Sequence, residues 1–401
     1  MKNPGGFHIL FAGLSGIPET PAAPIQRIIQ MGKALAAENR KVTYLNRLPG
    51  SHRTSIMADF FPGLDTVKIE DSLPAKNSYS NRYGRLAWKV LAFPAEFFKL
   101  ISIHRKEKID ILFIYTSWFG LVLFYVLTAK ILGSRTVLSY VEFRSGIASR
   151  SGFFMKINDR LFDRYAPCLV NGVNPISHRI EDHVEAVCPG KRQIRIPALC
   201  DFTPFDRLAV HNDTGLNYFL FCGSAGYFDL IRKTIQAFLS ICDRKGCCLQ
   251  LVISGDPRLL EPVRKEIEAH SEIRMVSGIP YDDLVSLYSG AMALVIPLRD
   301  IPQDNYRFPH KISEYTASRR PIITTNVGEI PWYFTDKENA IICRDTSGEA
   351  LTEAMEWALN HRKELDAIGM NGYRTGMENF SLTCYRKTLD TFLLDCLIIG
   401  Q

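Results

Sequence analysis

The sequence has few features of a metal or redox protein. Its 401 residues include 10 cysteines, but none forms a C-x-x-C pair and none clusters with histidine. Some thiols, such as Cys168 and Cys222, lie in apolar runs, so we expect them to be buried in a protein of a reducing compartment. The pattern therefore predicts no metal site, and no motif indicates a bound cofactor.

Long apolar runs are also absent. The most hydrophobic stretch, residues 118–132, is about 15 residues long, whereas a transmembrane helix needs roughly 20. We expect this stretch to form a helix that packs against a sheet. Residues 1–6 lead directly into an apolar run, which predicts no signal peptide and a cytoplasmic protein.

The charge is only mildly unbalanced, with a net value of +6 that is too weak to indicate nucleic-acid binding. Much of it lies in Asn81–Lys108, where seven basic and two acidic residues alternate with aromatic ones. Such a stretch is typical of an amphipathic helix on an anionic membrane surface. A crossover helix that packs its apolar face on a sheet has the same pattern, and both interpretations stay open.

Short apolar runs alternate with helical patterns along the chain. In the first half, the runs at 7–12, 42–45, 109–115 and 135–141 read as strands. The alternation restarts after 201–215, whose turn-forming residues make it the best linker candidate. We therefore expect an α/β protein with two Rossmann-like, doubly wound parallel-sheet domains that face a central cleft.

The loop after the first predicted strand contains Gly13, Ser15 and Gly16. Glycine lets a backbone approach a ligand closely, so this loop is a candidate for ligand contact. Its sequence is too irregular for the dinucleotide fingerprint. A tight turn without a ligand is the alternative.

Glu142 and Arg144 directly follow the predicted strand 135–141. Two oppositely charged side chains before a glycine suit a loop at the edge of a binding site, where Glu142 would have a polar or acid/base role. The alternative is a structural contact between the two side chains.

The most informative stretch is 278–330, which reads as helix, strand, polar loop, helix, strand and turn. Lys311 and Glu314 are three residues apart, near the start of the helix that follows Pro309, so they share one face. Free N–H groups and the helix dipole favour anions there. An ammonium beside a carboxylate can bind a phosphate and a sugar hydroxyl together, although an exposed ion pair is the alternative.

Several short motifs occur in this part of the chain at characteristic spacing. In order, they are Gly278-Ile279-Pro280, Pro297, Pro309-x-Lys311-x-x-Glu314-Tyr315, Pro321-Ile322-Ile323 and Gly328. From about Tyr218 to Asn379, the sequence resembles the C-terminal domain of GT-B glycosyltransferases. The resemblance is strongest to the retaining group called family 4, or glycosyl transferases group 1.

This resemblance implies a GT-B fold and a hexosyltransferase-like enzyme. Residues 1–203 would form the acceptor-side domain, residues 204–378 the nucleotide-sugar domain, and residues 379–401 a helix that crosses back to the first domain. The reaction would move a sugar from a UDP- or GDP-linked donor to an acceptor hydroxyl, with retention and without a metal ion. No cofactor beyond the donor substrate is implied.

The resemblance also implies roles for individual residues. Glu314 would accept hydrogen bonds from the ribose, and Lys311 would stabilise the diphosphate leaving group as a catalytic and donor-binding residue. Glu142 would be a catalytic residue of the other domain. The further donor-side residues would be Gly223, Ser224, Arg232 and Lys233, and the acceptor-side residues would be Gly13, Ser15, Gly16 and Arg144.

The sequence departs from the family pattern at two places. The family has two Glu separated by seven residues, but Tyr306 stands where the partner of Glu314 is expected. Tyr306 and the nearby Asp304 are both donor-side candidates. Ser224 follows Gly223 where the family has Arg, and Asp229 stands about where it has Lys. The phosphate-binding group is therefore either built from Arg232, Lys233 and Lys311 or weakened.

The resemblance predicts a lipid-linked or polysaccharide acceptor at the inner face of the membrane, in cell-surface polysaccharide or glycolipid assembly. The protein would be peripheral there, through Asn81–Lys108. Two alternatives stay open. A sugar-nucleotide 2-epimerase has the same fold and would act without an acceptor, and a non-catalytic protein with a degraded donor site would bind nucleotide sugars only.

Overall fold

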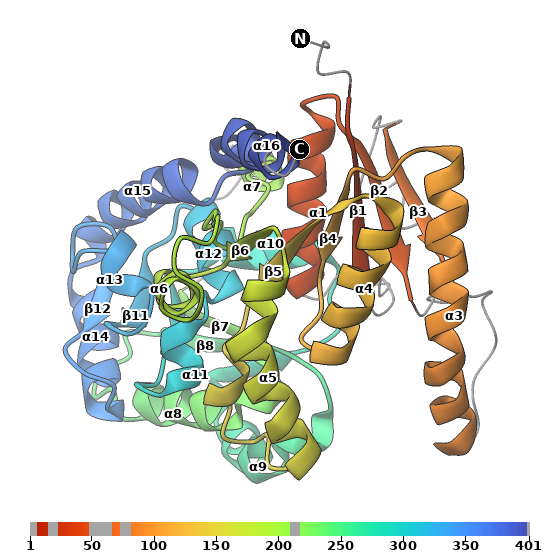
Figure 1. Cartoon of the computed structure of the whole chain (residues 1–401). Coiled ribbons are helices and arrows are strands. Elements are labelled where there is room, and N and C mark those ends of the chain that lie inside the picture. The colour runs from red at the N-terminus through yellow and green to blue at the C-terminus, as the bar shows by residue number, and fades with distance from the viewer. Residues whose placement is uncertain (1–5, 15–22, 48–65, 73–81, 209–216, 399–401) are drawn as a thin grey trace. The chain divides into compact units, whose positions relative to one another are not determined.

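The structure is a computed structural model, and it describes residues 6–14, 23–47, 66–72, 82–208 and 217–398 (Figure 1). Ser15 and Gly16, predicted to contact the acceptor, lie outside these residues. The chain forms two compact units. The first unit comprises the residues up to Leu199 together with the segment from Leu382 onward, and the second unit is Cys200–Ser381.

The first unit contains a parallel sheet of six strands in the order β3-β2-β1-β4-β5-β6. The strands are β1 His8–Leu14, β2 Lys41–Asn46, β3 Val67–Asp71, β4 Ile111–Ile114, β5 Arg135–Tyr140 and β6 Gly172–Pro175. All four residues of β4 are buried, as expected for a strand in a parallel sheet with helices on both faces.

The helices of the first unit connect and cover these strands. They are α1 Ala23–Ala36, α3 Arg82–Lys106, α4 Phe119–Leu132, α5 Phe153–Leu169, α6 His178–Val187 and α16 Leu382–Ile398. The helix predicted at 118–132 is confirmed as α4. It ends at Gly133, whose left-handed backbone (φ 67°) lets its N–H bond to carbonyls of the last turn. No helix among the described residues is long and apolar enough to cross a membrane.

Arg27 of α1 ties three distant segments of the first unit together. Its guanidinium is fully buried and donates to Ser139 Oγ (2.8 Å), Asn174 Oδ1 (2.6 Å) and the carbonyl of Ile196 (2.8 Å). Burial lowers the pKa of Arg27 to about 10. Asn174 is thus a core residue, and Ser177 rather than Asn174 caps α6.

The second unit repeats the architecture, with a parallel sheet in the order β12-β11-β10-β7-β8-β9. Its strands are β7 Tyr218–Ser224, β8 Cys248–Ser254, β9 Ile273–Val276, β10 Ala293–Ile296, β11 Ile322–Thr325 and β12 Ile341–Cys343. The expected α/β class with two doubly wound parallel sheets is therefore confirmed.

The helices of the second unit are α7 Thr203–Leu208, α8 Phe228–Leu239, α9 Glu261–Ala269, α10 Tyr281–Gly290, α11 Pro302–Tyr306, α12 His310–Ala317, α13 Ile330–Tyr333, α14 Gly348–Asn360 and α15 Arg362–Asn379. One expectation needs correction. The polar loop predicted within 278–330 contains the short helix α11. Cys222 is buried as expected, but Cys168 is exposed near the end of α5.

Candidate functional site

The strand order of the second unit defines where a ligand is expected. The chain runs outward from β7 to β9 on one side and from β10 to β12 on the other, so the order reverses between β7 and β10. Ligands of open parallel sheets bind at the carboxyl ends of the strands beside this reversal. Gly223 and Ser224 end β7, and Arg299 lies three residues beyond the end of β10.

Lys311 and Glu314 of α12 meet Tyr288 of α10 in a compact cluster. The ammonium of Lys311 donates to Glu314 Oε2 (2.8 Å) and to the Tyr288 hydroxyl (2.9 Å), and that hydroxyl lies 3.2 Å from Glu314 Oε2. The Lys311 side chain is 27% exposed and that of Glu314 is 17% exposed. The ion pair that the sequence left open therefore exists, but it is partly buried rather than on a solvated face.

The electrostatics of the cluster keep Lys311 charged. Burial lowers the pKa of Lys311, but the charge and the hydrogen bond of Glu314, together with the neighbouring Cys222, outweigh burial, so the net pKa is raised. Burial also raises the pKa of Tyr288, whose phenol thus remains a neutral hydrogen-bond donor. An ammonium in the first turn of a helix is opposed by the helix dipole, and Glu314 one turn later offsets this.

Tyr315 fixes α12 against the end of β7. Its hydroxyl accepts a hydrogen bond from the backbone N–H of Cys222 (3.0 Å), and its ring packs edge-on against Tyr288. The residue after Glu314 in the sequence therefore holds the helix beside the strand that ends in Gly223 and Ser224. The Lys311 cluster is in this way attached to the strand end where a ligand is expected.

A second charged cluster was not predicted. Asp304 of α11 is fully buried and accepts from the backbone N–H of Arg299 (3.0 Å) and from its Nε (2.8 Å). Arg307 contacts the other carboxylate oxygen at 2.8 Å. Burial raises the pKa of Asp304, but the hydrogen bonds from Arg299 and the charge of Arg307 lower it more, so the carboxyl group is ionised.

The two guanidinium groups of this cluster lie over the loop that follows β7. Those of Arg299 and Arg307 stand 5.7 and 4.7 Å from the ring centre of Tyr227, and Arg307 also donates to the Tyr227 hydroxyl. Arg299 bonds to Asp229 in the first turn of α8 (2.9 Å). The loop after β7 lacks the Arg and Lys of the family pattern, but positive charge is still present beside it. This charge comes from Arg299 and Arg307 in the segment after β10.

Other donor-side candidates lie apart from these clusters. Lys233 donates to the carbonyl of Thr346 (2.7 Å), and Arg232 is exposed on α8. Among the described residues, neither contacts Lys311 or Glu314 through a hydrogen bond or an ion pair. Tyr306 ends α11 and is half-buried.

The first unit brings its candidates to the equivalent edge of its own sheet. Gly13 has a left-handed backbone (φ 88°), and a Cβ there would lie 2.5 Å from the carbonyl oxygen of Tyr115, just after β4. Arg144 donates to Glu142 beyond the end of β5, so the structural contact between them is present. Glu142 nevertheless stays 30% exposed.

Gly328 positions the segment that carries Asp304. Its backbone is left-handed (φ 62°), and a Cβ there would lie 2.7 Å from the Asp304 carbonyl oxygen. Gly278 offers a matched control, because its φ is 66° and nothing lies within 4 Å of its Cβ position.

We therefore expect Gly328→Ala to destabilise the second unit by about 2 kcal/mol and Gly278→Ala by about 1 kcal/mol. Both replacements carry the left-handed backbone cost, and only Gly328→Ala adds a steric clash. Urea unfolding of the two variants measures the difference. Equal losses of stability would show that α11 moves away from the new methyl group without cost.

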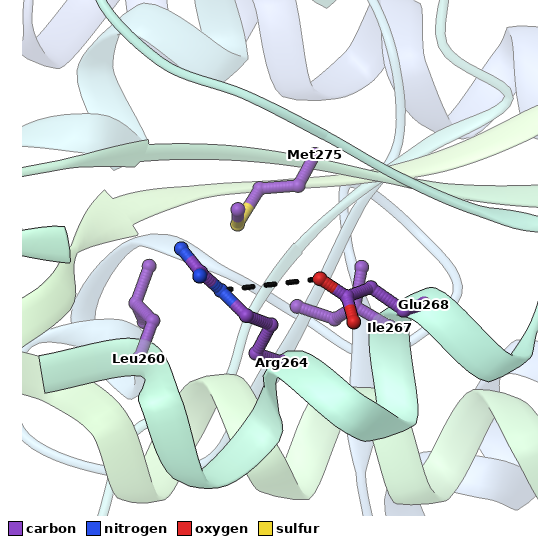
Figure 2. A pocket seen from close by; sticks show the side chains of 5 residues that line it. All are labelled: Leu260, Arg264, Ile267, Glu268 and Met275. Carbon is purple, nitrogen blue, oxygen red and sulfur yellow. Dashed lines mark ion pairs between the residues drawn. The ribbon is translucent and has the colours of Figure 1, made fainter. Parts of the chain in front are cut away.

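The second unit also has a pocket at the edge of its sheet, formed by α9 and β9. Figure 2 shows its lining side chains: Leu260, Arg264, Ile267, Glu268 and Met275. Two of these residues, Arg264 and Glu268, form an exposed ion pair with 4.0 Å between their charged atoms. Strand β8 separates β9 from β7, so this pocket is not part of the candidate site. Among the described residues, no group of three or more His, Cys, Asp or Glu side chains is arranged to hold a metal ion.

The second unit belongs to a known class of transferase domain. Residues 204–375 match the family model described as glycosyl transferases group 1. The protein is therefore an enzyme of the glycosyltransferase class, as its motifs predicted. A search of curated proteins found no match.

Solved structures with the same fold extend over nearly the whole chain. Sucrose-phosphate synthase from Thermosynechococcus elongatus is 15% identical, with a TM-score of 0.76 over 98% of this chain and 100% of that one. HepE of Anabaena in complex with UDP is 11% identical, with a TM-score of 0.71 over 97% and 100%. WaaG, a glycosyltransferase involved in lipopolysaccharide biosynthesis, is 14% identical, with a TM-score of 0.65 over 98% and 100%. These similarities show that the fold is GT-B.

Proposed function

We propose that the protein transfers a sugar from a nucleoside diphosphate sugar to an acceptor hydroxyl, with retention of configuration and without a metal ion. The observation that carries this proposal is the Lys311–Glu314–Tyr288 cluster beside the end of β7. A fixed ammonium can stabilise the charge that develops on a diphosphate leaving group. The carboxylate of Glu314 can accept hydrogen bonds from ribose hydroxyls.

We assign a supporting role to Arg299 and Arg307. Both guanidiniums face the loop after β7, where glycine and the start of α8 favour a phosphate. Asp304 would act as a positioning residue, because its carboxylate is buried against both arginines and cannot reach a sugar. Arg299, Arg307 and Lys311 together supply three cations, and this positive charge supports a reaction without a metal ion.

The donor is proposed to be UDP-linked, with GDP-linked sugars as the next candidates. HepE of Anabaena, which shares the fold, is described in complex with UDP-glucose. The proposed acceptor is a lipid-linked sugar or a growing surface polysaccharide at the cytoplasmic face of the membrane. The similarity of fold to WaaG supports this assignment, and Glu142 and Arg144 of the first unit would contact the acceptor.

A thermal-shift series with UDP-, GDP-, dTDP- and ADP-sugars tests the donor assignment. A ligand present at 100 times its dissociation constant stabilises the folded protein by about 2.7 kcal/mol. We expect a UDP-sugar to raise the melting temperature of the wild type and of Glu261→Ala. The shift should be lost in Glu314→Ala, because the ribose then has no carboxylate partner.

Glu261 is a matched control because it forms an ion pair of the same spacing with Arg264, but on the exposed surface of α9. A shift that survives Glu314→Ala would place the nucleotide elsewhere. Activity that disappears when EDTA is added would contradict the metal-free reaction. The anomeric configuration of the product, measured by NMR, tests retention.

A further inference from the structure

Large apolar side chains are exposed on two neighbouring helices of the first unit. On α4, Leu123, Leu127 and Ile131 are spaced four residues apart and form one exposed stripe, with Ile131 68% exposed. At the start of α5, Phe153 and Phe154 are 73% and 83% exposed. Exposed aromatic residues at such levels mark an interaction surface when they are contiguous with other apolar residues.

The two helices pack against each other (Figure 1), so their exposed side chains lie on neighbouring elements. Asn158 of α5 accepts from the backbone N–H of Phe119 (2.9 Å) and donates to the carbonyl of Ser117 (3.1 Å). These bonds hold the start of α4 beside α5. Trp118, which lies between the two bonded residues and is 53% exposed, adds a further aromatic ring to the surface.

Exposed charges on this surface have one sign. Lys130 of α4 and Lys156, Arg160 and Arg164 of α5 are exposed, and none of them forms an ion pair with another described residue. Residues 115–169 contain three acidic side chains, and each is half-buried or buried and bonded to a neighbour: Glu142 to Arg144, Asp159 to Arg150, and Asp163 to Tyr140. The surface, which we call the α4–α5 face, is therefore apolar and cationic.

We propose that the α4–α5 face docks the protein onto an anionic lipid bilayer. Aromatic side chains can insert at the level of the lipid headgroups, and lysine and arginine beside them can bind lipid phosphates. A second copy of the chain is a poorer partner, because a symmetric contact would place these unpaired cations against one another. The cores of protein interfaces also contain few lysines, whereas here lysines flank the apolar stripe.

The α3 helix, which contains most of the stretch predicted to meet a membrane, is a weaker candidate. It connects β3 to β4 as a crossover helix. Lys99 of α3 pairs with Glu70 at 2.8 Å, and Lys108, just beyond α3, pairs with Asp110 at 3.1 Å, so part of the positive charge of the stretch is neutralised within the protein. Phe98 is nevertheless 66% exposed, which makes it a useful comparison.

The position of the α4–α5 face fits the proposed acceptor. Trp118, Phe153 and Phe154 lie at the starts of their helices, and each helix begins after the carboxyl end of a strand of the parallel sheet. Glu142 and Arg144 follow the carboxyl end of β5. A bilayer on this face would thus present a lipid-linked acceptor near these two residues, a consequence that rests on the proposed function, whereas lipid binding itself does not.

Flotation of the purified protein with vesicles tests the proposal. We expect binding to vesicles of phosphatidylcholine with 30% phosphatidylglycerol, weak binding to pure phosphatidylcholine, and loss of binding in high salt. The double variant Phe153→Ser/Phe154→Ser should bind at least tenfold more weakly. Arg160→Glu should weaken binding about fivefold or more, and Arg160→Lys should not.

Two variants serve as controls that should bind like the wild type. Trp332→Ser removes an aromatic ring of the second unit that is 61% exposed, and Phe98→Ser removes the exposed ring of α3. Retained donor-induced thermal shifts in all variants would show that they are folded, and this measurement also tests the proposed function independently of lipid. Lipid binding without any donor shift would support the docking face and contradict the donor site.

Three outcomes would overturn the proposal. The first is no binding to anionic vesicles by a folded wild-type protein. The second is binding that Phe98→Ser abolishes and Phe153→Ser/Phe154→Ser leaves intact, which would place the contact on α3. The third is a dimer in solution that dissociates in Phe153→Ser/Phe154→Ser without lipid binding, which would make the face a contact between copies.

Discussion

Replacing Lys311 by alanine is expected to lower kcat for sugar transfer by about 10²–10³-fold, the usual effect of removing one preorganised group that stabilises developing charge. The ammonium is held in place by Glu314 and Tyr288 before any ligand arrives, so it needs little reorganisation during the reaction. Initial rates at saturating donor, with release of the nucleoside diphosphate as the readout, measure this effect.

The matched variant is Tyr288→Phe, which removes one hydrogen bond to Lys311 and keeps the charge. We expect it to lower kcat less than tenfold, since one such bond contributes about 1 kcal/mol. Lys311→Arg retains a cation, but it cannot occupy the same small site and should recover only part of the activity. If Lys311→Ala kept kcat within tenfold of the wild type, the charge at the leaving group would have to come from Arg299 or Arg307.

Replacing Asp304 by asparagine is expected to destabilise the second unit by about 3 kcal/mol at pH 7, because two guanidiniums then lose their buried counter-charge. This is the lower end for a broken buried pair, since Arg299 and Arg307 are 21% and 17% exposed and stay partly hydrated. Urea unfolding measures the loss. Asp206→Asn is the matched control, because Asp206 forms a 2.7 Å ion pair with Arg319 while 44% exposed, and it should cost less than about 1 kcal/mol.

The Asp304→Asn effect should depend on pH in one direction. The pKa of Asp304 is lowered in the folded protein, since the bonds from Arg299 and the charge of Arg307 together outweigh burial. A lowered carboxyl pKa stabilises the fold above the ordinary Asp value of about 3.9, and this stabilisation is lost as the pH falls through the folded pKa. The difference between wild type and variant should therefore be constant from neutral pH down to about 5 and shrink only below about 4. A difference that shrinks between pH 8 and 6 would point to another titrating group.

The alternation of strands and helices was predictable because buried parallel strands are short apolar runs. For this reason, β4 and β10 could be predicted from their apolar sequences alone. β9 was not predicted, because it is an edge strand in which Arg274 and Met275 are exposed, so it has no continuous apolar run. The break between α14 and α15 has no sequence signal, since it occurs at His361, which stacks on Trp357, and not at glycine or proline.

The site was predictable where its residues are close in sequence. Lys311 and Glu314 share a helix face by their spacing alone, and the structure places them in contact. Arg299 and Arg307 were missed because their relation to the loop after β7 depends on strand order, which brings the end of β10 beside β7. Two arginines around Asp304 in a polar loop were the available signal, but no local pattern distinguishes such a cluster from solvated charge.

The first unit contains segments that precede and follow the second unit in the sequence, so the second unit is fully synthesised before the first. α16 lies after the whole second unit in the chain, yet its Leu389, Phe392 and Leu393 belong to the apolar core of the first unit. Asp390 of α16 also accepts two bonds from Arg40, at 2.7 and 2.8 Å. Until the ribosome has synthesised α16, the apolar core residues that α16 covers in the first unit stay exposed, although the second unit is already complete. We therefore expect a chain truncated before α16 to bind chaperones and not to fold into an active enzyme.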